Sequence, residues 1–180
     1  MTGNSTTPTA GEKADILAML ADQRNSLLIT VRVIDDEQAR ARSTVSDLTL
    51  GGLIKHVSRM ERNWVRNIVE RDETAEFDME VAMETYFMAE GESISGLLAE
   101  YRAAVEETER VVASLDDLDL QVPLPTAPWA PERQWWSARR VLLHILRETA
   151  HHSGHADIIR EALDGANTTM QMGADAGMEF

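Results

Sequence analysis

The sequence predicts an all-α protein, a four-helix bundle with long crossover connections. Three observations indicate this fold: four long stretches repeat their apolar residues with a helical period, almost no segment alternates as a strand would, and four of the five prolines fall within residues 121–136. The chain has 180 residues, 43% of them hydrophobic, which is enough for one domain with a sizeable core. We expect a single bundle domain over residues 11–165, between flexible segments at 1–10 and 166–180.

The first two helices are expected over residues 12–33 and within residues 43–70. Both stretches return their apolar residues at spacings of three, four or seven, the period of one helical face. In the second stretch, serine and threonine residues that can cap a helix precede a pair of glycines and then the apolar positions. The apolar positions are Ile16, Leu17, Leu20, Leu27, Leu28 and Val31 in the first helix and Leu50, Leu53, Ile54, Val57, Met60, Trp64 and Ile68 in the second.

The third and fourth helices follow two longer connections. Residues 71–92 are acidic and weakly periodic, which indicates a crossover with a short helix or an extended piece. Ser93 or Ser95 should cap a helix that ends near Asp116, and the proline-rich residues after it should form a long surface loop. Ser137 should cap the last helix, which should stop at Gly165 because glycine readily adopts a left-handed conformation.

Two expectations follow for the packing of these elements. The core should include one or more residues from each of the last three helices: Leu53, Met60, Leu98, Leu142 and Ile159. The acidic crossover and the proline-rich loop should meet at one end of the bundle, near the metal site that the histidines of the fourth helix indicate.

Composition excludes several classes of function. The formal net charge of −14 repels phosphate backbones and anionic lipid headgroups, so we expect neither nucleic acid nor a membrane surface as a partner. No apolar run is long enough to span a bilayer, and the first residues lack the apolar segment of a signal peptide, so we expect a cytoplasmic protein. The chain has no cysteine, which excludes disulfides, thiolate metal ligands and a cysteine nucleophile.

Histidines gather on the fourth helix. On a helical wheel His144, Glu148, His151 and His155 fall within about 60°, and His152 lies about 40° from Glu148. Side chains three or four positions apart converge above a helix, and zinc, nickel and iron(II) favour imidazole and carboxylate ligands. Spacing alone leaves two pairs open, Glu148 with His152 and His151 with His155.

His56 is the one histidine outside the fourth helix. Its neighbours Leu53, Met60 and Trp64 are apolar and lie one or two turns away, so His56 should point into the bundle and supply a ligand from a second helix. Taken alone, His56 is more simply explained as a packed core histidine; the three closely spaced histidines of the fourth helix favour a metal site.

Two motifs resemble those of the DinB superfamily of metal-binding four-helix bundles. They are "LTLGGLIKHVSRMERNW" and, some eighty residues later, "SARRVLLHILRETAHHSGHADIIREALDG". In particular, the sequence looks like an actinobacterial branch, formerly of unknown function, that is itself similar to the mycothiol-dependent transferases. This resemblance implies a bundle of the DinB type with a divalent metal ion, zinc or nickel, as its cofactor.

The resemblance also implies particular ligands. Members of the superfamily use one histidine from the second helix and a His or Glu four residues before another His on the fourth, which corresponds here to His56, Glu148 and His152. His155 stands where the family often has a glutamine, so it is either a further metal ligand or a proton-carrying catalytic residue. His144 is expected near the site, and His151 is expected at the surface or at a dimer contact.

The function implied by the resemblance is a metal-dependent S-transferase. Such an enzyme would activate a low-molecular-weight thiol, mycothiol or a similar compound, and join it to a small-molecule electrophile. Two alternatives stay open: a hydrolase that uses metal-bound water, and a non-catalytic metal-binding protein linked to stress. A homodimer is a candidate assembly. Trp129, Trp135 and Trp136 could line a substrate entrance, although anchoring the loop to the bundle is the simpler role.

Overall fold

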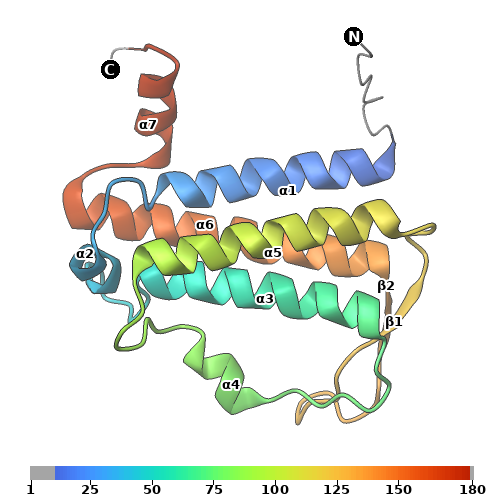
Figure 1. Ribbon diagram of the computed structural model, residues 1–180. Helices are drawn as coiled ribbons and strands as arrows, with labels where there is room; N and C mark the ends of the chain where they lie inside the picture. The colour runs from blue at the N-terminus through green and yellow to red at the C-terminus, as the bar shows by residue number, and fades with distance from the viewer. Residues whose placement is uncertain (1–10, 179–180) are drawn as a thin grey trace.

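The computed structural model describes residues 11–178 and confirms the all-α fold. Within these residues four long helices lie side by side as a bundle (Figure 1): α1 (Glu12–Ile29), α3 (Leu50–Glu70), α5 (Ile94–Ser114) and α6 (Ala138–Asp164). The shorter elements are α2 (Asp36–Arg40), α4 (Met79–Glu84), α7 (Thr168–Asp175) and the strands β1 (Gln121–Pro123) and β2 (Trp135–Ser137). The main packing contacts join α1 to α6, α6 to α3 and α3 to α5.

Side-chain caps fix the starts of three bundle helices. The hydroxyl groups of Thr49, Ser93 and Ser137 each accept a hydrogen bond from the backbone N–H three residues later. Gly165 ends α6 with a φ of 81°, the left-handed conformation expected at a helix C-terminus. The predicted caps at Ser93 and Ser137 and the predicted stop at Gly165 are therefore confirmed.

The first helix is shorter than predicted. It ends at Ile29, and the hydroxyl of Thr30 donates to the carbonyl of Leu27. Val33 then adopts a φ of 55°, and Asp35 opens α2 with a capping box. The apolar period continues past the real end of the helix, because residues at the turn are also packed against the core.

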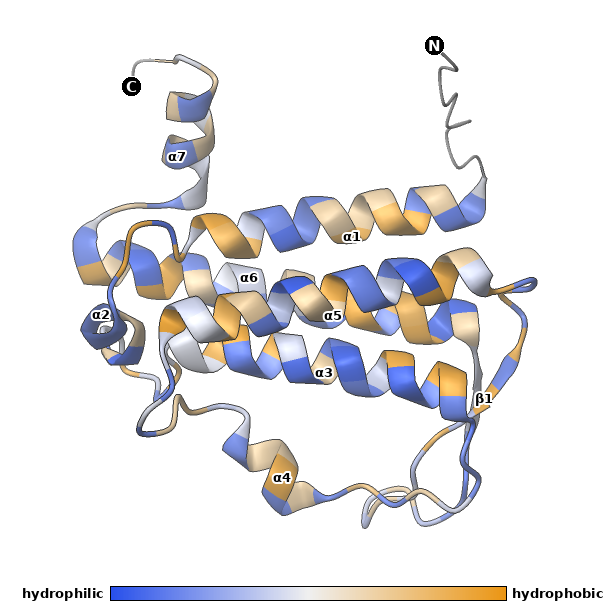
Figure 2. Ribbon diagram, in the orientation of Figure 1, coloured by the Kyte–Doolittle hydropathy of each residue, from blue (hydrophilic) through white to orange (hydrophobic). Residues whose placement is uncertain are grey.

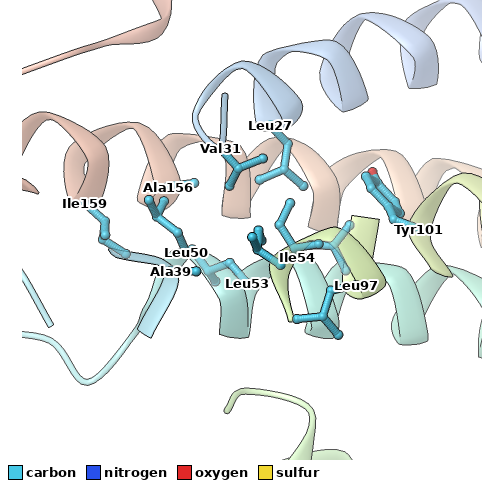
Figure 3. Packing of buried hydrophobic residues seen from close by; sticks show 12 residues of the cluster. Leu27, Val31, Ala39, Leu50, Leu53, Ile54, Leu97, Tyr101, Ala156 and Ile159 are labelled. Atoms are coloured by element: carbon cyan, nitrogen blue, oxygen red, sulfur yellow. The ribbon is translucent and has the colours of Figure 1, made fainter. Parts of the chain in front are cut away.

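Two clusters of buried apolar residues form the core. One, shown in Figure 3, includes Leu53, Leu97 and Ile159, and the other includes Leu20 and Leu142. Both apolar and hydrophilic residues recur along the bundle helices (Figure 2), as expected for helices that bury one face. Of the predicted core residues, Leu53, Leu142 and Ile159 are buried, while Met60 and Leu98 are partly buried against these clusters.

A buried ion pair lies inside the bundle. The guanidinium of Arg24 on α1 donates to the carboxylate of Glu61 on α3, and the Thr108 hydroxyl from α5 donates to the same carboxylate. The side chains of Arg24 and Glu61 are 4% and 0% exposed. Together with Thr108, this pair links three helices through polar contacts in addition to their apolar packing, and neither charged residue was singled out from the sequence.

The two long connections meet, which confirms that part of the expectation. The N–H of Phe77 donates to the carbonyl of Thr126 over 2.8 Å, and the N–H of Thr126 donates to the carbonyl of Ala75 over 3.1 Å. The guanidinium of Arg133 also donates to the Ala75 carbonyl, over 3.2 Å. The crossover contains the short helix α4, in agreement with the sequence. The proline-rich connection is not only loop, because its ends pair as the antiparallel strands β1 and β2.

The C-terminal segment differs from the expectation. Residues 166–180 were predicted to be frayed, but Thr168–Asp175 form α7, capped by Asn167. An ion pair of 2.5 Å between Arg32 and Asp175 ties α7 to the segment after α1. The expectation for residues 1–10 lies outside the described residues. Across 11–178, no helix combines the length and apolar character needed to cross a membrane.

Candidate metal centre

Facing helices bring three of the sequence-predicted ligands together. His56 comes from α3, and Glu148 and His152 come from α6, one turn apart. Each of these side chains offers one ligand atom, and the three atoms lie within 4.8 Å of one another. Among residues 11–178, His56, Glu148 and His152 are the one set of three or more His, Cys, Asp or Glu side chains that could hold a metal ion.

His56 presents a free ring nitrogen to this group. Its Nδ1 lies 2.9 Å from the hydroxyl oxygen of Thr85, and that hydroxyl donates its own hydrogen to the carbonyl of Ala82 over 2.6 Å. The Thr85 oxygen must therefore accept from Nδ1–H, which leaves the lone pair on Nε2. Nε2 is buried and has no hydrogen-bond partner among residues 11–178. A buried, unpartnered acceptor is costly unless something occupies the site, so the arrangement fits a metal ion.

The ring of Tyr86 supports His56 from the crossover. The two rings are stacked, with centroids 4.0 Å apart and planes 18° apart. A methyl group on Gly52 would lie 2.1 Å from the carbonyl oxygen of Tyr86, so the absence of a side chain at Gly52 permits this close approach. The first turn of α3 therefore determines where Tyr86 sits.

Both imidazoles are neutral near pH 7. Burial, together with a smaller effect of the nearby His152, lowers the pKa of His56 to about 4. Burial also lowers the pKa of His152, against the opposing effect of the Glu148 carboxylate. Neutral imidazoles are the form that binds metal, so the site does not have to lose protons from its histidines at neutral pH.

Glu148 supplies the negative charge of the group. Burial raises the pKa of its carboxyl, but the hydrogen bond from Arg147 and the nearby His144 and His152 together lower the pKa below its usual value. Arg147 donates to one carboxylate oxygen over 2.9 Å, and Nε2 of His152 lies 3.9 Å from the other. The carboxylate is therefore ionised and held beside His152.

The remaining histidines lie around this group. Nδ1 of His155 is 3.5 Å from Nδ1 of His152, but the structure does not bring His155 into the group of three. His151 is exposed, as one of its two expected positions requires, and its ring centroid is 4.4 Å from that of His155. Nδ1 of His144 lies 3.8 Å from a carboxylate oxygen of Glu148, and the ring centroids of His144 and Trp64 are 4.6 Å apart.

A cavity of about 560 Å³ opens beside His56. It lies between α3, the crossover and the proline-rich connection, and its lining includes His56, Trp64, Tyr86, Trp129 and Trp136. The indoles of Trp64 and Trp136 are parallel, with centroids 5.3 Å apart and planes 1° apart. Trp136 thus anchors the connection to α3 and also lines the cavity, so both roles considered from the sequence apply to it.

Sequence reasoning missed the residues of the crossover. Thr85 and Tyr86 belong to a segment without a clear period, and their contacts with His56 span about thirty residues of chain. The paired glycines at the start of α3 were the available signal, since a glycine in a helix often permits close approach of another backbone.

A four-helix bundle with a His/Glu group shared between two facing helices is consistent with the DinB-like class that the sequence resembles. Comparison with family models gives the particular family. The model described as mycothiol-S-transferase matches residues 15–165, so the chain belongs to this family.

Comparison with solved structures gives the same fold. The crystal structure of the conserved protein of locus from Enterococcus faecalis is similar with a TM-score of 0.63 and 14% sequence identity, over 88% of this chain and 100% of that chain. At this identity the likeness shows the fold alone. Among curated proteins none matches the chain.

Proposed function

We propose that this protein is a metal-dependent S-transferase that joins mycothiol, or a similar low-molecular-weight thiol, to an electrophile. The observation that carries the proposal is the buried, unpartnered Nε2 of His56 beside Glu148 and His152. Membership of the mycothiol-S-transferase family supports the choice of thiol.

His56, Glu148 and His152 would hold the ion, for which zinc and nickel suit the ligand types. When bound, the cation would lower the pKa of a thiol and favour the thiolate. Thr85 fixes the tautomer of His56, and Arg147 holds the carboxylate of Glu148. These contacts keep the donor atoms aimed at one point before any ligand arrives.

His155 is proposed as the proton-carrying group of the site. Its Nδ1 lies 3.5 Å from Nδ1 of His152, and its side chain is half-buried. An imidazole in this place can take up the thiol proton and pass it to solvent. The role of a further metal ligand is the other assignment considered for His155.

The overall reaction needs no sulfur from the protein. The thiol loses its proton, its sulfur forms a bond to the electrophilic carbon, and the leaving group departs with the electron pair of the broken bond. Because the chain has no cysteine, the sulfur nucleophile of this reaction must come from the co-substrate.

The test uses full-length protein loaded with zinc or nickel, mycothiol and chlorodinitrobenzene. We expect absorbance from the thioether product that depends on both the thiol and the metal, and that disappears in metal-stripped protein. His152→Ala should lose this activity and the exposed neighbour His151→Ala should keep it. Ester hydrolysis without thiol would instead support a hydrolase, and no turnover of either substrate by a metal-loaded protein would support a non-catalytic role.

A further inference from the structure

We propose that the cavity beside His56 is the binding site of the electrophile, and that it selects an aromatic electrophile without negative charge. The assignment of an electrophile rests on the proposed S-transferase function. The preference for an uncharged or cationic aromatic compound rests on the walls of the cavity and is independent of the metal.

The walls of the cavity are rich in aromatic rings. Phe77 and Trp129 meet edge to face, with centroids 5.1 Å apart, and both side chains are exposed. Tyr86, which also lines the cavity, is stacked on His56. The lining therefore has aromatic rings both at exposed positions and beside a candidate metal ligand. A planar aromatic ligand gains stacking and edge-to-face contacts on such walls that an aliphatic ligand of equal size does not.

The charges around the cavity disfavour an anion. The lining residues include the carboxylates of Glu76, Asp78 and Glu132 and one guanidinium, that of Arg66. Arg66 is itself 3.8 Å from Glu70, so its charge is partly offset. The balance of the lining is negative, and indole faces attract cations rather than anions.

The size of the cavity suits a small organic ligand. Its volume of about 560 Å³ lies within the usual range of small-molecule sites, about 300–1,000 Å³. The side-chain amides of Asn63, Asn67 and Gln134 in the same lining offer donors and acceptors for neutral polar substituents. An uncharged aromatic compound with polar substituents matches both parts of the wall.

Calorimetric titration of metal-free full-length protein tests this inference. The probes are para-nitroanisole, para-nitrobenzylammonium and para-nitrobenzoate, which share a ring and differ in charge. We expect the neutral and cationic probes to bind at least about threefold more tightly than the anion, since exposed carboxylates act through solvent and are partly screened. Equal or tighter binding of para-nitrobenzoate, or no binding of any probe, would overturn the inference.

Variants locate the binding. Trp129→Ala should weaken para-nitroanisole binding about tenfold, the scale of losing one stacking partner. Trp135→Ala is the matched control, since Trp135 is an exposed tryptophan of the same connection outside the cavity lining; it should leave the affinity within about twofold. Equal losses in both variants would refute the assignment.

A charge variant tests the selection itself. Glu132→Gln should tighten para-nitrobenzoate binding about twofold to threefold without changing para-nitroanisole, while Glu73→Gln, on the crossover but outside the lining, should change neither. Because these measurements use neither thiol nor metal, they separate the two proposals. If the neutral and cationic probes bind more tightly than the anion but no thiol is transferred, only the S-transferase proposal is refuted. If thiol is transferred but the probes do not bind in this order, only the electrophile site is refuted.

Discussion

The hydroxyl of Thr85 decides which nitrogen of His56 faces the candidate metal site. It accepts from Nδ1–H because its own hydrogen goes to the Ala82 carbonyl. Thr85→Val keeps the shape and removes this acceptor, so His56 can adopt the other tautomer. We expect zinc affinity to fall about tenfold or more, the usual effect of losing such an orienting partner. Thr74→Val is the control: Thr74 lies on the same connection and its hydroxyl donates to Asp72, so this variant should bind zinc normally.

The choice between the two helical pairs is settled by alanine variants. His56→Ala, Glu148→Ala and His152→Ala should each lower metal retention at least about tenfold, because each would remove one of three ligands. His151→Ala should have little effect, since His151 is exposed, and His155→Ala should fall between these limits. Elemental analysis after gel filtration measures the retained metal. Loss of metal in His151→Ala together with retention in Glu148→Ala would assign the site to His151 and His155 instead.

The buried histidines make the metal-free protein sensitive to mild acid. Burial lowers the pKa of His56 from 6.5 to about 4, so the unfolded chain binds more protons than the folded one between these values. Stability is thus full above pH 6.5 and is lost as the pH falls toward 4. His56 alone should remove about 2 kcal/mol of the free energy of unfolding between pH 7 and pH 5.

Urea denaturation of metal-free protein at several pH values measures this dependence. His56→Gln removes the titrating group and should flatten the curve over the same range. A free energy of unfolding that changes no more in the unaltered protein than in His56→Gln would contradict the assigned burial of His56.

At the scale of the elements, two glycines make a matched pair. Gly52 lies under the carbonyl of Tyr86, which an added methyl group would contact at 2.1 Å, whereas the same group at Gly154 of α6 meets nothing within 4 Å. Gly52→Ala must push the crossover away from α3, so we expect a loss of thermal stability together with weaker zinc binding. Gly154→Ala should raise stability, by up to about 1 kcal/mol, because alanine favours a helix. Thermal melts with and without zinc check both; equal effects would contradict the close approach at Gly52.

The sequence predicts the bundle helices well, because their signals are local. Ser93, Ser137 and Gly165 mark helix ends by side-chain and backbone chemistry that acts within one turn. The end of α1 was predicted too late because Val31 still packs against the core after the helix has ended at Ile29. Periodicity reports burial, and burial continues through a turn.

The candidate site shows the same difference between features with local signals and features that depend on distant packing. His56, Glu148 and His152 could be selected from spacing and family resemblance, since two of them are one turn apart. Thr85 and Tyr86 could not, because a contact between a crossover and a helix depends on how the whole chain packs. The irregular tail predicted after Gly165 was wrong for a similar reason: α7 is tied to Arg32, a residue far away in the sequence.

At the scale of the whole molecule, the buried ion pair between Arg24 and Glu61 joins α1 to α3. Arg24→Met would leave the carboxylate of Glu61 buried with Thr108 as its remaining partner, and we expect a loss of about 3–5 kcal/mol in the free energy of unfolding. The double variant Arg24→Met with Glu61→Leu should recover most of this loss, since no charge stays buried.

Arg42→Met is the control for charge removal. The side chains of Arg42 and its partner Asp47 are 59% and 77% exposed. Breaking this pair should therefore lower the free energy of unfolding by less than about 1 kcal/mol. Urea unfolding of the four proteins provides the comparison. A double variant as unstable as Arg24→Met would contradict the view that an uncompensated charge is the source of the loss.

The two connections that line the cavity lie apart from the helices that carry the candidate ligands, which affects how the substrate range of such a protein could evolve. The candidate ligands belong to α3 and α6, whereas most of the cavity wall belongs to two connections that lie outside the bundle. Under the proposed function, reactivity and substrate range would therefore be encoded by different stretches of the chain and could change at different rates. The two connections hold each other through the backbones of Phe77 and Thr126. To give this bundle a new substrate range, both connections should be replaced together. A single foreign connection would lose the backbone hydrogen bonds that join it to the other one.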